Sequence, residues 1–90
     1  MREIAAIEIP HSLRAYGKCK HVRCGEDVTS QITSVELVQY EPGGGYYLLY
    51  KGLLGEELND LFFDTTQECV EQIKFEFGED ISRNLAEQLV

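Results

Sequence analysis

The fold of this 90-residue chain is decided by residues 34–64, SVELVQYEPGGGYYLLYKGLLGEELNDLFFD. Three segments within it, 34–41, 46–51 and 57–64, are rich in the valine, leucine and aromatic side chains that are typical of strands. The runs PGGG and GLLG separate these segments, and glycine supplies the positive φ that tight turns need. Because both connections are short, the stretch predicts an antiparallel meander.

The residues before this stretch predict further short elements. Residues 2–9 alternate apolar side chains as a strand does, and Pro10 ends the run. Residues 11–17 predict a short helical turn closing at a glycine, residues 19–24 a short strand, and residues 25–27 a turn. The sheet is therefore expected to have about four or five strands.

A first helix is predicted after the meander. Thr65 and Glu68 fit a capping box, in which the threonine oxygen accepts from the Glu68 backbone N–H and the glutamate reaches back. Gly78 is placed to end this helix in a left-handed conformation. The apolar side chains that fall on one helical face are Cys69, Val70, Ile73 and Phe77.

A second helix is predicted over residues 79–90, with Asp80 as its cap. Its apolar residues, Ile81, Leu85 and Leu89, recur at every fourth position. Together these patterns predict a single α+β domain over residues 1–90, an antiparallel meander sheet packed by one or two C-terminal helices.

Both faces of the predicted sheet carry apolar side chains. Leu58 and Phe62 point one way, whereas Leu61 and Phe63 point the other way. An antiparallel sheet with one solvated face would be apolar on one side only. The first helix covers one face; the second helix, a dimer mate or a partner protein is expected to cover the other.

The charge of the chain excludes several partner classes. The net charge is −8, and it is unevenly spread: residues 1–25 carry five basic against two acidic side chains, residues 26–90 three against fourteen. Such a chain repels nucleic acid and anionic membranes and attracts a basic protein surface. Its longest apolar run, residues 46–50, is far short of a membrane span. With 43% hydrophobic residues, the chain has enough apolar side chains for a core.

The cysteines and the N-terminus predict a cytoplasmic protein. Three cysteines cannot all pair internally, whereas a small secreted domain usually has an even number. Glu3 and Glu8 interrupt the stretch where a secretory signal would be apolar.

The cysteine and histidine residues do not match a known metal or catalytic pattern. Cys19, His21 and Cys24 have the wrong spacing for a zinc knuckle, and on a strand Cys24 would point away from the other two. Cys19 and His21 are a conceivable nucleophile pair, but nothing nearby resembles an oxyanion loop. Cys69 on an apolar helix face behaves as a small hydrophobe. We expect no cofactor, no metal and no catalysis, with a small enzyme using Cys19 or the acidic cluster of residues 56–64 as the less favoured alternative.

A cluster of basic residues lies near the N-terminus, with Tyr16 as the one aromatic among them. A nucleic-acid surface would interleave more aromatic side chains. We therefore expect the cluster to pair with the acidic part of the chain or with a partner. Its members are His11, Arg14, Lys18, Lys20, His21 and Arg23.

Residues 45–78 carry a resemblance to known proteins. The segments GYYLLY, GEEL, DT, EQ and FEFG, in this order, resemble a group of small uncharacterised bacterial α+β proteins and, more loosely, the small acidic immunity proteins that neutralise bacterial toxins. The resemblance implies a binding role and carries no catalytic motif. The chain departs from the group at Leu53–Leu54, where a polar turn is expected, and at Leu61–Phe62, where a larger aromatic is expected.

The two adjacent leucines in the GLLG turn are the strongest candidate for a binding surface, because turn tips are normally polar. Either the turn folds back and buries them, or they form an exposed apolar knob with an acidic rim. Asp60 is expected at the sheet rim. We predict an immunity-like or inhibitor-like module that binds a partner protein, with a homodimer possible; the alternative is an acidic nucleic-acid mimic. The candidate partner-binding residues are Leu53, Leu54, Glu56, Glu57, Asp60 and Asp64.

Overall fold

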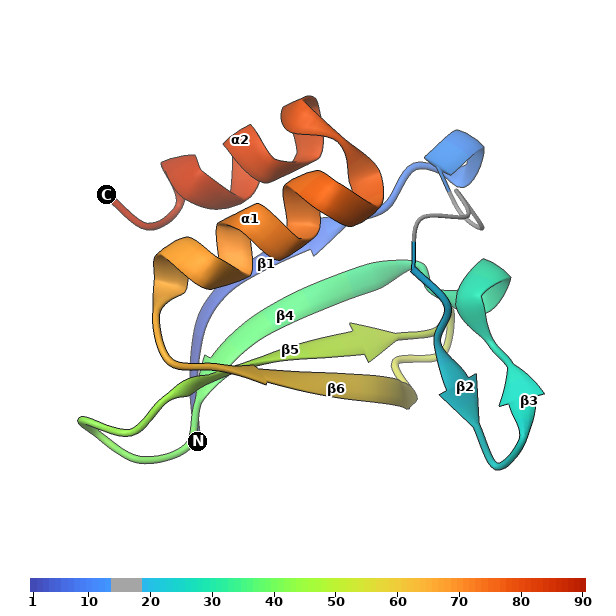
Figure 1. The fold of residues 1–90 in the computed structure, drawn as a ribbon, viewed down its shortest axis with the longest axis horizontal. Helices are drawn as coiled ribbons and strands as arrows, with labels where there is room; N and C mark the ends of the chain where they lie inside the picture. The colour runs from blue at the N-terminus through green and yellow to red at the C-terminus, as the bar shows by residue number, and fades with distance from the viewer. Residues whose placement is uncertain (14–18) are drawn as a thin grey trace.

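The computed structural model describes residues 1–13 and 19–90 and contains a four-stranded antiparallel sheet. The strand order is β1-β4-β5-β6, so the last three strands form the predicted meander and β1 pairs with β4 at one edge (Figure 1). The α+β fold with an antiparallel meander is confirmed. The four strands are β1 (Arg2–Glu8), β4 (Ser34–Gln39), β5 (Tyr46–Lys51) and β6 (Glu57–Phe63).

A small hairpin beside the sheet differs from the sequence-based expectation. The predicted strand 19–24 is reduced to β2 (Val22–Arg23), and the predicted turn 25–27 is displaced. Cys24 and Gly25 form the turn instead, with φ of 52° and 80°, and β3 (Glu26–Asp27) follows at once. Two short 3₁₀ helices flank this region, η1 (His11–Leu13) and η2 (Thr29–Gln31). The rest of the predicted turn 11–17 lies outside the described residues.

The first C-terminal helix, α1 (Thr66–Phe77), begins as predicted. The Thr65 side chain accepts from the Glu68 backbone N–H at 3.2 Å, and the Glu68 carboxylate accepts from the Thr65 N–H at 3.1 Å. Gly78 ends α1 with φ 96° and ψ 175°, a conformation that glycine tolerates but that is not the predicted left-handed one.

The second helix, α2 (Glu79–Glu87), starts directly after Gly78, which serves as its N-cap without a side-chain bond. The prediction that Asp80 caps this helix is therefore wrong. Asp80 lies in the first turn, where its charge still favours the helix dipole. Neither helix in the described ranges has the length and apolar character needed to cross a membrane.

Both helices lie on the same face of the sheet (Figure 1). The alternative in which the second helix covers the other face is therefore wrong. The helix α2 packs beside α1 and against β1, while α1 packs against β5 and β6. Among the described residues, no helix covers the opposite face. The core between the helices and the sheet includes Ala5, Ile7, Ile9, Val35, Leu37, Leu48, Tyr50, Cys69, Ile73 and Leu85.

A side chain bonds to the backbone of one residue on each edge strand of the sheet. At the β1 edge, the Gln88 side-chain amide accepts from the Ala6 N–H at 3.1 Å and donates to the Ala6 carbonyl at 2.8 Å. At the β6 edge, the Arg23 guanidinium donates to the Glu57 carbonyl at 2.7 Å. Edge strands pair readily with other chains when they are left open. These bonds occupy backbone groups of Ala6 and Glu57 that would otherwise be available for such pairing.

Candidate functional site

The turn between β5 and β6 places Leu53 and Leu54 in solvent. Their exposed fractions are 81% and 89%. Of the two alternatives that the sequence left open, the buried turn is wrong. The two leucines are exposed, and their role in binding stays a prediction.

The acidic residues predicted around this turn do not all gather there. The Glu56 carboxylate folds back over Gly52 and accepts from the Leu54 N–H at 2.9 Å, so it shapes the turn. Glu57 is exposed beside it. Asp60 is exposed in the middle of β6, and Asp64 is exposed beyond the far end of that strand. The structure thus joins four of the six candidate residues in one place and leaves Asp60 and Asp64 apart.

A buried polar cluster, which the sequence did not predict, lies between the hairpin and α1. The backbone of His21 is held on both sides: its N–H donates to Thr29 Oγ1 at 2.8 Å, and its carbonyl accepts from the Val28 N–H at 2.8 Å. Asp27 in turn accepts from the Thr29 N–H at 2.9 Å. The hydrogen bonds from Thr29 lower the pKa of the Asp27 carboxyl.

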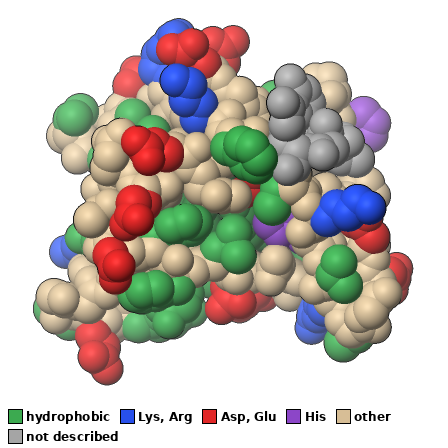
Figure 2. Space-filling view, in the orientation of Figure 1, with side chains coloured by type: hydrophobic (Ala, Val, Ile, Leu, Met, Phe, Trp, Pro, Cys, Tyr) green, Lys and Arg blue, Asp and Glu red, His purple; other side chains and the backbone are tan. Residues whose placement is uncertain are grey.

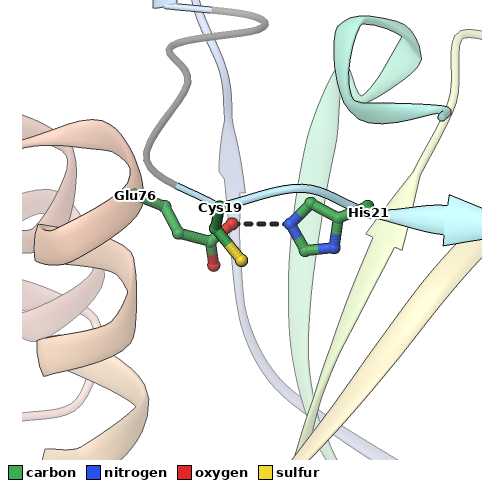
Figure 3. A group of neighbouring side chains, drawn as sticks. All are labelled: Cys19, His21 and Glu76. Atoms are coloured by element: carbon green, nitrogen blue, oxygen red, sulfur yellow. Dashed lines mark hydrogen bonds and ion pairs between the residues drawn. The ribbon is translucent and has the colours of Figure 1, made fainter.

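The His21 ring meets Glu76 of α1 at the centre of this cluster (Figure 3). The distance from His21 Nε2 to Glu76 Oε1 is 2.6 Å, and the two residues are only 1% and 3% exposed. The imidazole also packs against the Tyr50 ring, with the centroids 4.1 Å apart and the ring planes tilted by 38°.

Two further side chains donate to the Glu76 carboxylate. The Tyr50 hydroxyl and Gln72 Nε2 donate to Oε2, the latter at 3.0 Å. The Cys19 thiol lies beside them, and Gln72 Nε2 also contacts its Sγ at 4.0 Å. Burial, followed by the charge of Glu76, raises the pKa of Tyr50 well above its usual value. Among the described residues, every buried side-chain nitrogen and oxygen has a hydrogen-bond partner. The buried Glu76 carboxylate therefore has protein donors in place of water.

The hydrogen bonds of Asn59 determine where the His21 proton sits. Asn59 Oδ1 accepts from the Asp60 N–H at 2.9 Å, which leaves Asn59 Nδ2 to donate to His21 Nδ1 at 2.8 Å. Because Nδ1 is the acceptor, Nε2 carries the hydrogen and donates it to Glu76.

A metal ion fits this arrangement poorly, although the ligand types are suitable. Atoms of Cys19, His21 and Glu76 lie within 4.8 Å of one another, and zinc binds thiolate, imidazole and carboxylate. A metal would need the Nε2 lone pair, so Asn59 would have to turn over and lose its bond to the Asp60 N–H. Cys24, whose spacing argued against a shared site, is exposed in the hairpin turn.

The cluster also disfavours nucleophilic catalysis. Burial and the neighbouring Glu76 raise the pKa of the Cys19 thiol, whereas a catalytic cysteine has a lowered pKa. Cys19 Sγ accepts from Gln72 Nε2 at 4.0 Å, while both ring nitrogens of His21 are bonded to Glu76 and Asn59. We interpret the cluster as a clasp that fixes the hairpin to α1 and the sheet.

The sequence did contain one signal for this clasp. Glu76 is seven residues after Cys69 and three after Ile73, so it falls on the apolar face of α1. A carboxylate on a buried helix face requires partners, but the pattern alone does not name them.

The predicted basic cluster does not form as one surface in the described residues. His21 is buried in the clasp, and Arg23 is bound to the Glu57 carbonyl. Lys20 and His11 are exposed. Arg14, Lys18 and the neighbouring Tyr16 lie outside the described residues.

No protein-family model, no curated protein and no solved structure matches this chain.

Proposed function

We propose that this protein binds a partner protein with a basic surface and caps a functional site of that partner, as an immunity protein or inhibitor does. The observation that carries the proposal is the exposure of Leu53 and Leu54, at 81% and 89%, on a single turn. Clustered apolar side chains with a polar rim are typical of interaction sites.

The turn is fixed in shape, which favours binding. The Gly52 N–H donates to the Glu56 carbonyl at 2.9 Å, and the Gly55 N–H donates to the Gly52 carbonyl at 3.0 Å. The Glu56 carboxylate adds the bond to the Leu54 N–H. A preformed turn loses little entropy on binding, so more of the contact energy appears as affinity.

A groove beside the turn gives the surface depth and charge. Its volume is about 460 Å³, and Leu53 forms part of one wall while Glu8 supplies a carboxylate. Glu57 is exposed at the start of β6, two residues after Gly55 of the groove lining. An apolar knob with carboxylates beside it complements a partner with a pocket and a basic rim.

An acidic nucleic-acid mimic is the second candidate, and one observation favours it. Figure 2 shows Asp and Glu side chains in a row over the N-terminal half of α1 and the turn before it. The exposed acidic residues there are Asp64, Glu68 and Glu71. A mimic would use this row, whereas the leading proposal uses the Leu53–Leu54 turn.

The test is affinity capture from the native cell followed by measurements on a double variant. With the captured protein purified, Leu53→Ser combined with Leu54→Ser should weaken binding by about 2 kcal/mol or more, roughly 30-fold, and leave the thermal midpoint unchanged. Phe75→Ser, at a residue that is 57% exposed on α1, is the matched control and should bind at full strength. A double variant that melts normally and binds fully would refute the proposal. Loss of binding in a Glu71→Gln, Asp64→Asn variant, with competition by duplex DNA for the partner, would favour the mimic.

A further inference from the structure

A second surface feature lies at the opposite end of β5 from the Leu53–Leu54 turn. It is a pocket of about 400 Å³ on the sheet face that the helices leave uncovered. Tyr47 and Phe62 pair across β5 and β6, while their neighbours Tyr46 and Phe63 pack towards the core. The residues that line the pocket are Tyr40, Glu41, Gly44, Gly45, Tyr47 and Phe62.

Three aromatic rings form the wall of this pocket. The centroids of Tyr40 and Tyr47 are 5.2 Å apart with the planes at 73°, and those of Tyr47 and Phe62 are 5.1 Å apart at 64°. Such edge-to-face pairs hold the rings in defined orientations. Tyr40 and Phe62 are nevertheless 47% and 52% exposed, so ring surface remains available to a ligand.

The backbone around the pocket is also fixed. The Gly44 N–H donates to the Glu41 carbonyl at 3.0 Å across a turn with Gly43 at φ 79°, as in a type II turn. Gln39 Nε2 donates to the Gly44 carbonyl at 3.0 Å. At Gly45 a Cβ would lie 2.3 Å from the Phe62 ring, so the glycine makes room for that ring against the backbone.

The chemistry of the lining points to a planar cation. The faces of aromatic rings attract positive charge. Of the described residues that line the pocket, Glu41 is acidic and none is basic. A guanidinium group stacks on ring faces, is weakly hydrated and pairs with a carboxylate through two N–H groups. An ammonium group is compact and strongly hydrated, and it does not stack in this way.

We propose that this aromatic pocket binds an arginine side chain of the partner protein. The assignment of the arginine to a partner rests on the proposed function, while the preference for a guanidinium rests on the pocket alone. The net charge of −8 supports a basic partner. The strand β5 has six residues, so the pocket and the leucine turn lie about 20 Å apart, within the breadth of one standard protein interface.

The test uses a small probe, so it does not require the partner. The tripeptide acetyl-Gly-Arg-Gly-amide is titrated into the ¹⁵N-labelled protein, and the citrulline tripeptide, which has the same shape without the charge, is titrated in parallel. The arginine peptide should produce saturable shifts of the Gly44 and Gly45 amides, and the citrulline peptide should bind several-fold more weakly. Equal responses to the two peptides, or no saturable shift at these glycines, would overturn the assignment.

Variants then locate the interaction. Phe62→Leu should weaken binding of the arginine peptide about two- to fivefold, the range expected for an exposed cation–π contact. Glu41→Gln, which does not disturb the rings, should weaken this binding by a similar factor.

The Leu53→Ser, Leu54→Ser variant should bind the peptide as well as the unmodified protein does. If that variant loses the partner but keeps the peptide, both proposals stand; if it keeps the partner while the peptide still binds, only the proposed function fails. Unchanged peptide binding in both pocket variants would place the guanidinium elsewhere and refute the pocket.

Discussion

His21 and Glu76 form a buried pair across 55 positions of sequence, with Nε2 and Oε1 2.6 Å apart. The pair ties the segment before β2 to the last turn of α1. Two more helix and strand residues, Gln72 and Tyr50, converge on the same carboxylate. One glutamate therefore connects the hairpin, the sheet and the helix.

Removing the Glu76 carboxylate should destabilise the fold strongly. Glu76→Ala leaves the buried donors of His21, Tyr50 and Gln72 without their acceptor, and each buried donor left unsatisfied costs about 1–3 kcal/mol. Tyr50→Phe removes one donor to the charge and should cost less, about 1.5–3 kcal/mol. Urea unfolding followed by circular dichroism measures both changes.

Glu71→Ala is the matched control for this prediction. Glu71 lies on the exposed side of the same helix, so its loss should change the free energy of unfolding by less than about 0.5 kcal/mol. Equal stability of the Glu76→Ala and Glu71→Ala variants would mean that the clasp does not hold the fold together.

The sequence predicted the sheet and the first helix well because local patterns determine them. The strands 46–51 and 57–63 are bounded by glycine turns, and the Thr65–Glu68 box marks the start of α1. The clasp was not predictable in this way. Its histidine and its glutamate are each unremarkable locally, and only the packing of the hairpin against α1 brings them together.

The uncovered face illustrates a second limit. The pattern correctly indicated apolar side chains on both faces of the meander, but it was wrong to place Leu58 on the face of Phe62. A register shift in the β5–β6 pairing puts Leu58 in the core, on the side of Leu61 and Phe63.

The pattern also does not specify on which side α2 packs. The observed side follows from Leu85, which is buried in the same core as Ile73 of α1. The face that remains carries Tyr47 and Phe62, and these now form part of the aromatic pocket.

The three thiols should differ in their reactivity towards iodoacetamide. Cys24 is exposed and should be alkylated first. Burial raises the pKa of Cys69 to about 12, and burial together with Glu76 raises the pKa of Cys19. Since the thiolate is the reacting form, a raised pKa leaves less of it at a given pH, and both residues should react more slowly.

Peptide mass spectrometry over a time course at mildly alkaline pH measures these rates. The Cys69 rate should continue to rise with pH beyond 9.0, its ordinary pKa, and a Cys24→Ser variant should lose only the fast phase. Alkylation of Cys19 as fast as that of Cys24 would indicate an activated thiol and would support the enzymatic alternative.

The helix cap gives a separate test of the fold. Thr65→Ala removes the acceptor for the Glu68 N–H and should cost about 1 kcal/mol. Thr66→Ala, at the first helical residue, is the control and should have little effect, because the capping bonds go to Thr65 and Glu68. Thermal melts compare the two; equal midpoints would show that the capping box contributes nothing.

The association rate with the partner should depend steeply on salt. Exposed acidic residues dominate the described surface from Glu26 onwards, and a basic partner would be steered by them, which can raise the on-rate about 10- to 1,000-fold. The steering falls as the screening length shortens from about 30 Å at 0.01 M to about 3 Å at 1 M salt. Stopped-flow measurements across this range should therefore give an on-rate that falls strongly as the salt concentration rises.

The Leu53→Ser, Leu54→Ser variant should keep the same salt slope and lose affinity through a faster off-rate, because short-range apolar contacts act after the encounter. An on-rate independent of salt would exclude both a basic partner and a nucleic-acid mimic, and it would leave the two leucines as the centre of an apolar interface.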